Sequence, residues 1–163
     1  MRTTAFIISI VLPFFLVTQI HSQNVVQNLS VSQLSPRPLI ATEQEVNQFL
    51  KDYIERYTNK DIDGFLWLFS LKAVQNQKDR LQGIREIYSN YFDQTQTLHC
   101  RIEDRKVEIY ENAVEVRARY EIEQIVKKGG GKKVWRGWIR WVLIREDGIL
   151  KILSIDYKHE KTP

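Results

Sequence analysis

Two carboxylates and one imidazole are the side chains that could transfer protons: Asp63, Asp156 and His99. A working base normally sits in a pocket that tunes its pKa. Asp63 lies beside Asp61 where a helix cap is expected, and His99 alternates with apolar neighbours and so should face solvent. No His/Asp or Tyr/Asp pair is visible in the spacing, so we assign no catalytic residue. If the chain is an enzyme, Asp156 or Asp63 is the base and Tyr57 the proton donor.

An arginine among apolar residues is the candidate for holding an anion. If residues 129–131 form a three-residue hairpin loop, Tyr120 lies opposite Arg140 on an otherwise apolar sheet face. A lone arginine there needs a carboxylate, a ligand anion or a route to solvent. Either Arg140 binds an acidic ligand with Tyr120 and Tyr57 as hydrogen-bonding neighbours, or it forms a structural ion pair or extends to the rim.

Aromatic side chains are numerous enough to line a ligand cavity, which would be mostly apolar with few polar groups. Packing in a hydrophobic core explains the same residues equally well, so both hypotheses stay open. The full set that we predict to contact a ligand, if there is one, is Arg140, Tyr120, Tyr57, Tyr53, Trp138, Trp67 and Tyr88.

The pairing that places Arg140 beside Tyr120 leaves a second apolar face on the last two strands. That face would hold Trp135, Ile139, Trp141 and Ile152. So much apolar surface does not face solvent in a stable monomer. We therefore predict a homodimer in which two copies pack sheet against sheet through these four residues.

Metal, cofactor and nucleic-acid sites have little support. Cys100 is the single cysteine, and His21, His99 and His159 are scattered, so we expect no metal and no disulfide. Residues 129–131 bridge two strands instead of opening a helix, so they are no phosphate loop, and we expect no cofactor. The lysines around them form either an anion-contacting tip or a solvated hairpin end; we expect no nucleic-acid partner.

The N-terminal part of the domain is predicted to be helical. Residues 42–45 form a capping box, and residues 46–57 repeat apolar side chains at helical spacing. A short helix is predicted from about residue 61, a short strand over 72–77, and a third helix over about 84–92.

From residue 97 onward the apolar period changes to two, which indicates strands. The phase slips near residues 103–106, which predicts a bulge. Four long antiparallel strands, of which the last pair is joined by a turn at Asp147-Gly148, follow the helices. Long strands curl, and a bulge adds to the curl, so the sequence predicts an α+β domain in which helices occupy the hollow of a bent sheet.

The N-terminal segment resembles an export signal. Residues 1–22 combine Arg2, an apolar run that is too short to span a bilayer, and a small residue at Ser22. Residues 23–42 have no helical or strand period and resemble a flexible tether. We predict a domain over 43–160, no stable membrane span, and a mature chain that is secreted or periplasmic; an uncleaved anchor is the alternative.

The net charge of the predicted domain is smaller than that of the whole chain. The chain has 163 residues and a formal net charge of +4. All 20 acidic residues lie in 43–160, whereas Arg2, Arg37 and Lys161 are outside it, so 21 of the 24 basic residues remain and the domain is at +1. A nearly neutral domain does not demand an acidic partner.

The order of three short motifs resembles the nuclear transport factor 2-like (SnoaL-like) superfamily: NKDIDGFLWLF at 59–69, GIREIY at 83–88 and DGILKI at 147–152. The resemblance covers about residues 43–158; Leu150 stands where that superfamily often has tryptophan. It implies a cone-shaped α+β fold, with three N-terminal helices packed in a strongly curved antiparallel sheet, and a pocket. The chain looks closest to accessory domains of bacterial L,D-transpeptidase-type cell-wall proteins, which implies a role in the cell envelope.

The resemblance does not choose a function, because members include isomerases, dehydratases, cyclases, binding domains and scaffolds. Our leading hypothesis is an exported, non-catalytic domain that binds a small molecule or protein partner in its cone. The alternatives are a small isomerase, dehydratase or cyclase with an acid/base pair, and a dimerisation scaffold. A carboxylate bonded to Tyr or His beside a cavity would favour the enzyme, a free Arg140 in the cavity would favour anion binding, and a filled core would favour the scaffold.

Overall fold

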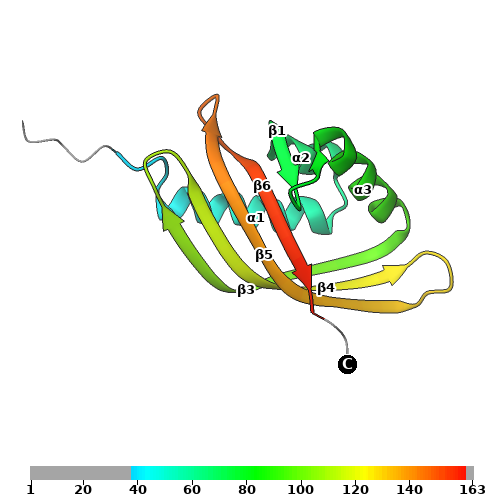
Figure 1. The fold of residues 1–163 in the computed structure, drawn as a ribbon. Helices are drawn as coiled ribbons and strands as arrows, with labels where there is room; N and C mark the ends of the chain where they lie inside the picture. Colours follow the sequence, from blue (N-terminus) through cyan, green and yellow to red (C-terminus); the bar gives the residue numbers. More distant parts are fainter. Residues whose placement is uncertain (1–37, 161–163) are drawn as a thin grey trace, which may run out of the picture. The chain divides into compact units, whose positions relative to one another are not determined.

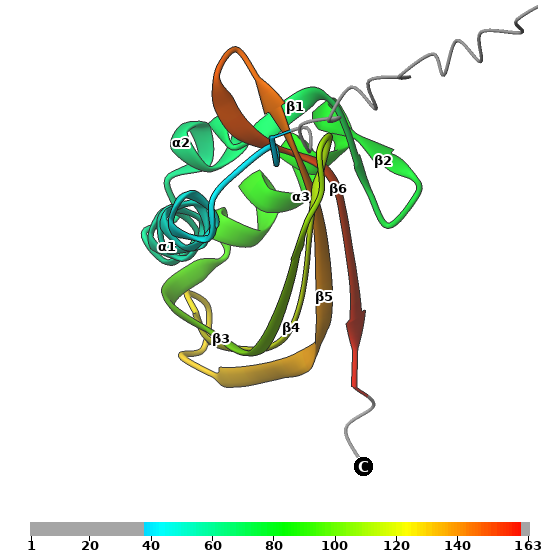
Figure 2. The same ribbon diagram turned by 90° about the vertical axis from the view of Figure 1, so that its left-hand side faces the viewer.

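A computed structural model describes residues 38–160, in which three helices precede four long strands and lie on the concave side of one sheet (Figures 1 and 2). The predicted signal, and the tether up to residue 37, lie outside the described residues. No helix within 38–160 is long and apolar enough to cross a membrane. The elements are α1 (Glu43–Thr58), α2 (Ile62–Trp67), β1 (Phe69–Gln75), β2 (Asp79–Arg80), α3 (Leu81–Asp93), β3 (Thr95–Ile109), β4 (Val114–Val126), β5 (Lys132–Glu146) and β6 (Ile149–His159).

The first helix begins where its capping box places it. The Thr42 hydroxyl accepts from the backbone N–H of Glu45 at 3.2 Å, and the Glu45 carboxylate accepts from the backbone N–H of Thr42 at 2.8 Å. The predicted apolar stripe is buried, Tyr53 and Tyr57 included. Just before the helix, Ala41 of the predicted tether is already buried against the domain.

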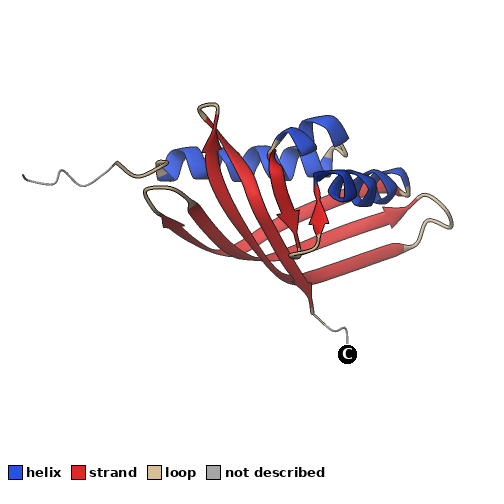
Figure 3. Ribbon diagram, turned by 45° about the horizontal axis from the view of Figure 1, so that its top comes forward, coloured by secondary structure: helices blue, strands red, loops and turns tan. Residues whose placement is uncertain are grey.

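The sheet has six strands in the order β2-β1-β6-β5-β4-β3, with helices on one face (Figure 3). The four long strands pair antiparallel as predicted. The short strand β1 pairs parallel with β6, so the sheet is mixed and the purely antiparallel prediction is wrong at this pair. Parallel neighbours need a long crossover connection, and here α3 and the β3–β5 strands separate β1 from β6 along the chain.

The predicted bulge is confirmed on β3. The register with β4 shifts between Glu103 and Lys106, and Asp104 adopts a left-handed backbone with φ of +49°. Figure 2 shows β3, β4 and β5 bending beneath the helices. The α+β class and the curved sheet are therefore confirmed.

The predicted register of the β4–β5 hairpin is wrong. Tyr120 lies opposite Gly137, not Arg140. The last strand pair is Ile125–Lys132, and the Val126 N–H donates to the Gly131 carbonyl at 3.0 Å, so the loop is longer than three residues. The partner of Tyr120 shifts by three positions. An odd shift exchanges the two faces of a strand, because side chains alternate with a period of two.

The exchanged faces relocate the predicted dimer interface. Trp141 and Ile152 are fully buried within the chain, and Ile139 is 8% exposed. These three residues form the floor of the core beneath the helices, so they are covered within the chain and do not form a surface for a second copy. Of the four predicted residues, only Trp135 keeps substantial exposure, at 38%.

Candidate functional site

A cavity of about 230 Å³ lies between helices α1 and α3 and the concave face of the sheet. Its wall is almost wholly apolar or aromatic, and six of the seven tyrosines in the chain contribute to it. Ile87, Trp135 and His159 are partly exposed, so the cavity meets solvent beside them. The lining residues are Tyr53, Tyr57, Ile87, Tyr88, Tyr91, Cys100, Ile102, Tyr120, Ile122, Trp135, Ile139, Tyr157 and His159.

Tyrosines from the two long helices form the helical side of the wall. Tyr53 and Tyr57 follow one another by one turn of α1 and their rings stack 6.2 Å apart; Tyr88 of α3 meets the Tyr57 ring edge-on at 6.1 Å. Burial raises the pKa of all three phenols well above the ordinary value. They therefore stay protonated and offer neutral hydroxyls to whatever the cavity holds.

The thiol of Cys100 lies on the sheet side of the cavity. Burial raises its pKa to about 12, because a thiolate would lose its hydration without gaining a cationic neighbour. The group is therefore a neutral thiol at physiological pH, and it acts as a small apolar surface on the wall.

The most polar contact on the wall joins two strands that are not neighbours. The hydroxyl of Tyr120 on β4 lies 2.6 Å from Nδ1 of His159 on β6. The His159 ring also packs against Trp135 at 5.2 Å and Tyr157 at 5.6 Å between ring centroids. Sequence reasoning missed His159, which was counted among scattered histidines. The available signal was Gly137, a glycine within a long strand, which marks a close approach of other groups.

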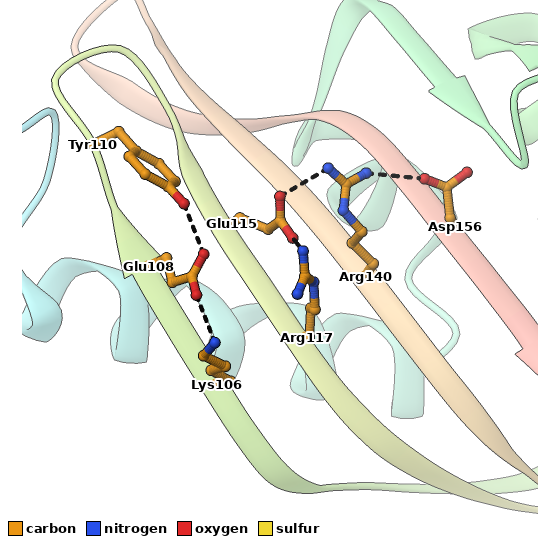
Figure 4. A network of polar contacts seen from close by, with 7 residues as sticks. All are labelled: Lys106, Glu108, Tyr110, Glu115, Arg117, Arg140 and Asp156. Carbon is orange, nitrogen blue, oxygen red and sulfur yellow. Dashed lines mark hydrogen bonds and ion pairs between the residues drawn. The ribbon is translucent and has the colours of Figure 1, made fainter.

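Arg140 is on the opposite face of the sheet from the cavity. Its guanidinium donates to Glu115 at 2.8 Å and to Asp156 at 3.3 Å (Figure 4). Glu115 also contacts Arg117, so one carboxylate lies between two guanidinium groups. Hydrogen bonding from Arg140 lowers the pKa of Glu115. The structure therefore agrees with the structural ion-pair hypothesis for Arg140.

Neither predicted base reaches the cavity. Asp156 belongs to the outer-face pairing with Arg140. Asp63 lies in the first turn of α2, is highly exposed and pairs with Arg85 at 3.0 Å. The neighbouring Asp61 caps that helix, since its carboxylate accepts from the Gly64 N–H at 3.0 Å. The proton donor of the enzyme hypothesis, Tyr57, therefore lies on the cavity wall, but neither proposed base lies there.

Two predicted tryptophans also lie outside the cavity. Trp67 is 47% exposed and is covered by the Lys151 ammonium at 3.5 Å from the ring centroid. Trp138 is 52% exposed on the outer face, where the Arg119 guanidinium lies 5.4 Å from its ring. The predicted ligand residues that the structure brings together are Tyr53, Tyr57, Tyr88 and Tyr120.

The wall is suited to neutral ligands. Within the described part of the chain, none of the residues that line this cavity is an aspartate, glutamate, lysine or arginine. The same part of the chain holds no group of three or more His, Cys, Asp or Glu side chains placed to bind a metal ion. What remains is a set of phenol hydroxyls and one imidazole that can donate and accept hydrogen bonds.

Solved structures with the same fold share little sequence with this chain. A proposed aromatic ring hydroxylase from Novosphingobium aromaticivorans matches with a TM-score of 0.66 and 19% identity, over 73% of this chain and 89% of that one. A proposed scytalone dehydratase from the same organism gives 0.67 and 10%, over 72% and 83%. A nuclear transport factor 2-like superfamily protein from Salmonella enterica gives 0.65 and 14%, over 73% and 91%. At these identities the likeness shows the fold alone.

The sequence itself carries the family assignment. The comparison with curated proteins finds no match. The profile of the SnoaL-like domain matches residues 46–156, from the first turns of α1 to β6. That range is more than half of the chain and contains most of the cavity wall, with Tyr157 and His159 just beyond it. The chain belongs to the SnoaL-like domain family.

Proposed function

We propose that the chain binds an uncharged, largely apolar small molecule in the cavity between its helices and the concave face of its sheet. The observation that carries this proposal is the wall: phenol hydroxyls held neutral by burial, apolar side chains, and no carboxylate, lysine or arginine among its described residues. A buried charge without a partner costs several kcal/mol. A charged ligand would meet that cost here, and a neutral ligand would not.

The size and chemistry of the wall favour an aromatic ligand. A cavity of about 230 Å³ is small beside the roughly 300–1,000 Å³ of typical drug-sized sites. Aromatic walls offer edge and face contacts to a flat ring. The names of two structural neighbours, an aromatic ring hydroxylase and a scytalone dehydratase, are compatible with this class of ligand.

Calorimetric titration with two coumarins tests the proposal. Neutral 7-methoxycoumarin should bind the full chain, and the anion coumarin-3-carboxylate should bind at least about tenfold more weakly, because no lysine or arginine among the described wall residues pairs with its charge. Equal binding of the two, or tighter binding of the anion, would contradict the proposal.

A matched pair of variants tests whether binding occurs in this cavity. Ile87 and Ile149 are each 39% exposed, but only Ile87 lines the cavity. Ile87→Trp should obstruct the opening and weaken 7-methoxycoumarin binding at least about tenfold, whereas Ile149→Trp should leave it unchanged. If both variants bind as the original chain does, the ligand occupies another surface.

Export and a cell-envelope role remain part of this proposal on the strength of the sequence alone. The apolar run and small residue of segment 1–22 support them. N-terminal sequencing of the chain recovered from a host that secretes it should give Gln23 as the first residue. A chain that keeps Met1 and stays with the membrane fraction would favour the uncleaved anchor. Dimerisation remains a prediction as well, without Trp141 and Ile152 as its surface.

A further inference from the structure

Three strands place the Tyr120–His159 contact in one transverse row. Tyr120 on β4 is opposite Gly137 on β5, and Gly137 is opposite His159 on β6. The tyrosine therefore reaches across a whole strand to the imidazole, with 2.6 Å between its hydroxyl oxygen and Nδ1. Both side chains line the cavity at the end of the wall where His159 is exposed to solvent.

Gly137 is what makes this contact possible. A Cβ atom built on Gly137 would lie 2.7 Å from the Tyr120 hydroxyl oxygen and 2.0 Å from the carbonyl oxygen of Lys158. Both distances are shorter than any normal contact, and the second involves backbone that cannot rotate away. Any side chain at this position would push the hydroxyl off its path to His159. Strand β5 therefore has a glycine, which carries no side chain, at the position that Tyr120 must cross to contact His159.

The pair can relay a proton between the cavity and solvent. Burial raises the pKa of Tyr120 to about 12, so its oxygen keeps a proton in the resting state. When Nε2 carries the imidazole proton, Nδ1 accepts the Tyr120 O–H, and the Tyr120 oxygen can accept a second hydrogen bond. Among the described residues of the wall, His159 has the side chain whose ring nitrogen can take up that proton.

We propose that Tyr120 and His159 form a proton relay that selects aromatic ligands bearing an acidic hydroxyl, and that such ligands ionise when they bind. The ligand hydroxyl gives its proton to the Tyr120 oxygen while Tyr120 passes its own proton to Nδ1 of His159. The products are a bound phenolate, a neutral Tyr120 and an imidazolium. The net charge of the complex does not change, and the new anion and cation lie one tyrosine apart.

This inference rests on the proposed function and narrows its ligand to phenols. A neutral phenol enters the apolar cavity without a desolvated charge and acquires its charge only beside the imidazolium. A methyl ether of the same ring has the same shape but no proton to give. The difference between a phenol and its methyl ether therefore isolates the relay from simple apolar binding.

The test uses 7-hydroxycoumarin, whose excitation spectrum distinguishes phenol from phenolate, and 7-methoxycoumarin. At a pH where free 7-hydroxycoumarin is protonated, the full chain should show the phenolate band and bind the phenol at least about tenfold more tightly than the ether, as expected for a charge-assisted hydrogen bond. Tyr120→Phe and His159→Gln should abolish the band and equalise the two affinities. Binding of the ether should persist in both variants, which shows that they are folded.

Matched controls on the outer face separate the relay from a general loss of phenol or imidazole. Tyr110→Phe and His99→Gln remove the same chemical groups from residues that do not line the cavity, and the phenolate band should remain. Gly137→Ala should lose the band as Tyr120→Phe does. Equal binding of phenol and ether to the original chain, or a band that survives Tyr120→Phe, overturns the relay while cavity binding stands. Failure of both coumarins to bind overturns the relay and the proposed function together.

Discussion

The two faces of the sheet around strands β4 and β5 shift the pKa values of their ionisable side chains in opposite directions. On the concave face, burial raises the pKa of Tyr120 and of Cys100 on neighbouring β3, so their groups hold protons. On the convex face, arginines lower the pKa values of Glu115 and Glu121, so these carboxylates lose theirs. Alternate residues of the same strands thus line a neutral ligand cavity on one face and carry paired charges on the other. The sheet therefore places ligand binding on its concave face and the charges that favour solubility on its convex face.

The pH dependence of stability should divide between the two faces. A raised pKa in the folded state stabilises the fold fully below the unfolded value and loses that contribution as pH rises towards the folded value. Cys100, at about 12 against 9.0, and the buried tyrosines therefore predict a steep loss of stability above about pH 9. The lowered pKa values of Glu115 and Glu121 predict a separate loss as pH falls below 4.5.

Urea unfolding across pH 9 to 11 should show this alkaline loss, and each such group contributes a slope of about 1.4 kcal/mol per pH unit. Cys100→Ala should flatten the slope by about that amount. Added salt should reduce the loss of stability at acidic pH, which depends on ion pairs, more than the loss at alkaline pH. An alkaline slope unchanged by Cys100→Ala would show that the thiol is not desolvated.

Two tryptophans on β5 give the next contrast. Trp141 is fully buried and Trp138 is 52% exposed. Trp141→Ala should reduce the free energy of unfolding by about 3–5 kcal/mol because it opens a cavity in the core, whereas Trp138→Ala should cost less than about 1 kcal/mol. Urea denaturation of both variants measures the difference. Equal costs for the two variants would show that Trp141 is not packed in the core of the folded chain.

The smallest effect should separate two carboxylates of the convex face. Glu115 lies between Arg117 and Arg140 and its side chain is 15% exposed, whereas Glu123 pairs with Lys132 and is 34% exposed. Glu115→Gln should cost about 1 kcal/mol and Glu123→Gln less than about 0.5 kcal/mol, by thermal or urea unfolding. Equal costs would mean that the paired arginines add nothing to an ordinary surface ion pair.

Local patterns predicted much of this molecule. The first helix, with its capping box, and the bulge before Lys106 depend on residues close in sequence, and both are confirmed. Tyr53 and Tyr57, which line the cavity, could be predicted because helical spacing alone places them on the buried face of α1. Arg140 was misplaced because its side depends on where a hairpin loop closes, and three consecutive glycines allow several closures.

The Tyr120–His159 contact could not be read from either residue. It depends on the combined register of three strands, and an error in the first hairpin carries through to the second. The face that Asp156 occupies depends on register in the same way: the β5–β6 register shifts between Val142 and Leu143, and that shift decides which face the carboxylate occupies. Gly137 was a local signal of close packing, but it did not name the groups that meet there.

The C-terminal end of β6 joins the two faces. His159 meets Tyr120 on the concave side, and the next residue, Glu160, pairs with Arg119 at 2.7 Å and donates its backbone N–H to the Arg136 carbonyl at 2.8 Å. The end of β6 is thus fastened from both sides at the opening of the cavity. Its occasional release would set how fast a ligand enters and leaves, so ionic strength would act on exchange rates through Glu160 while the equilibrium preference for a ligand stays with the wall.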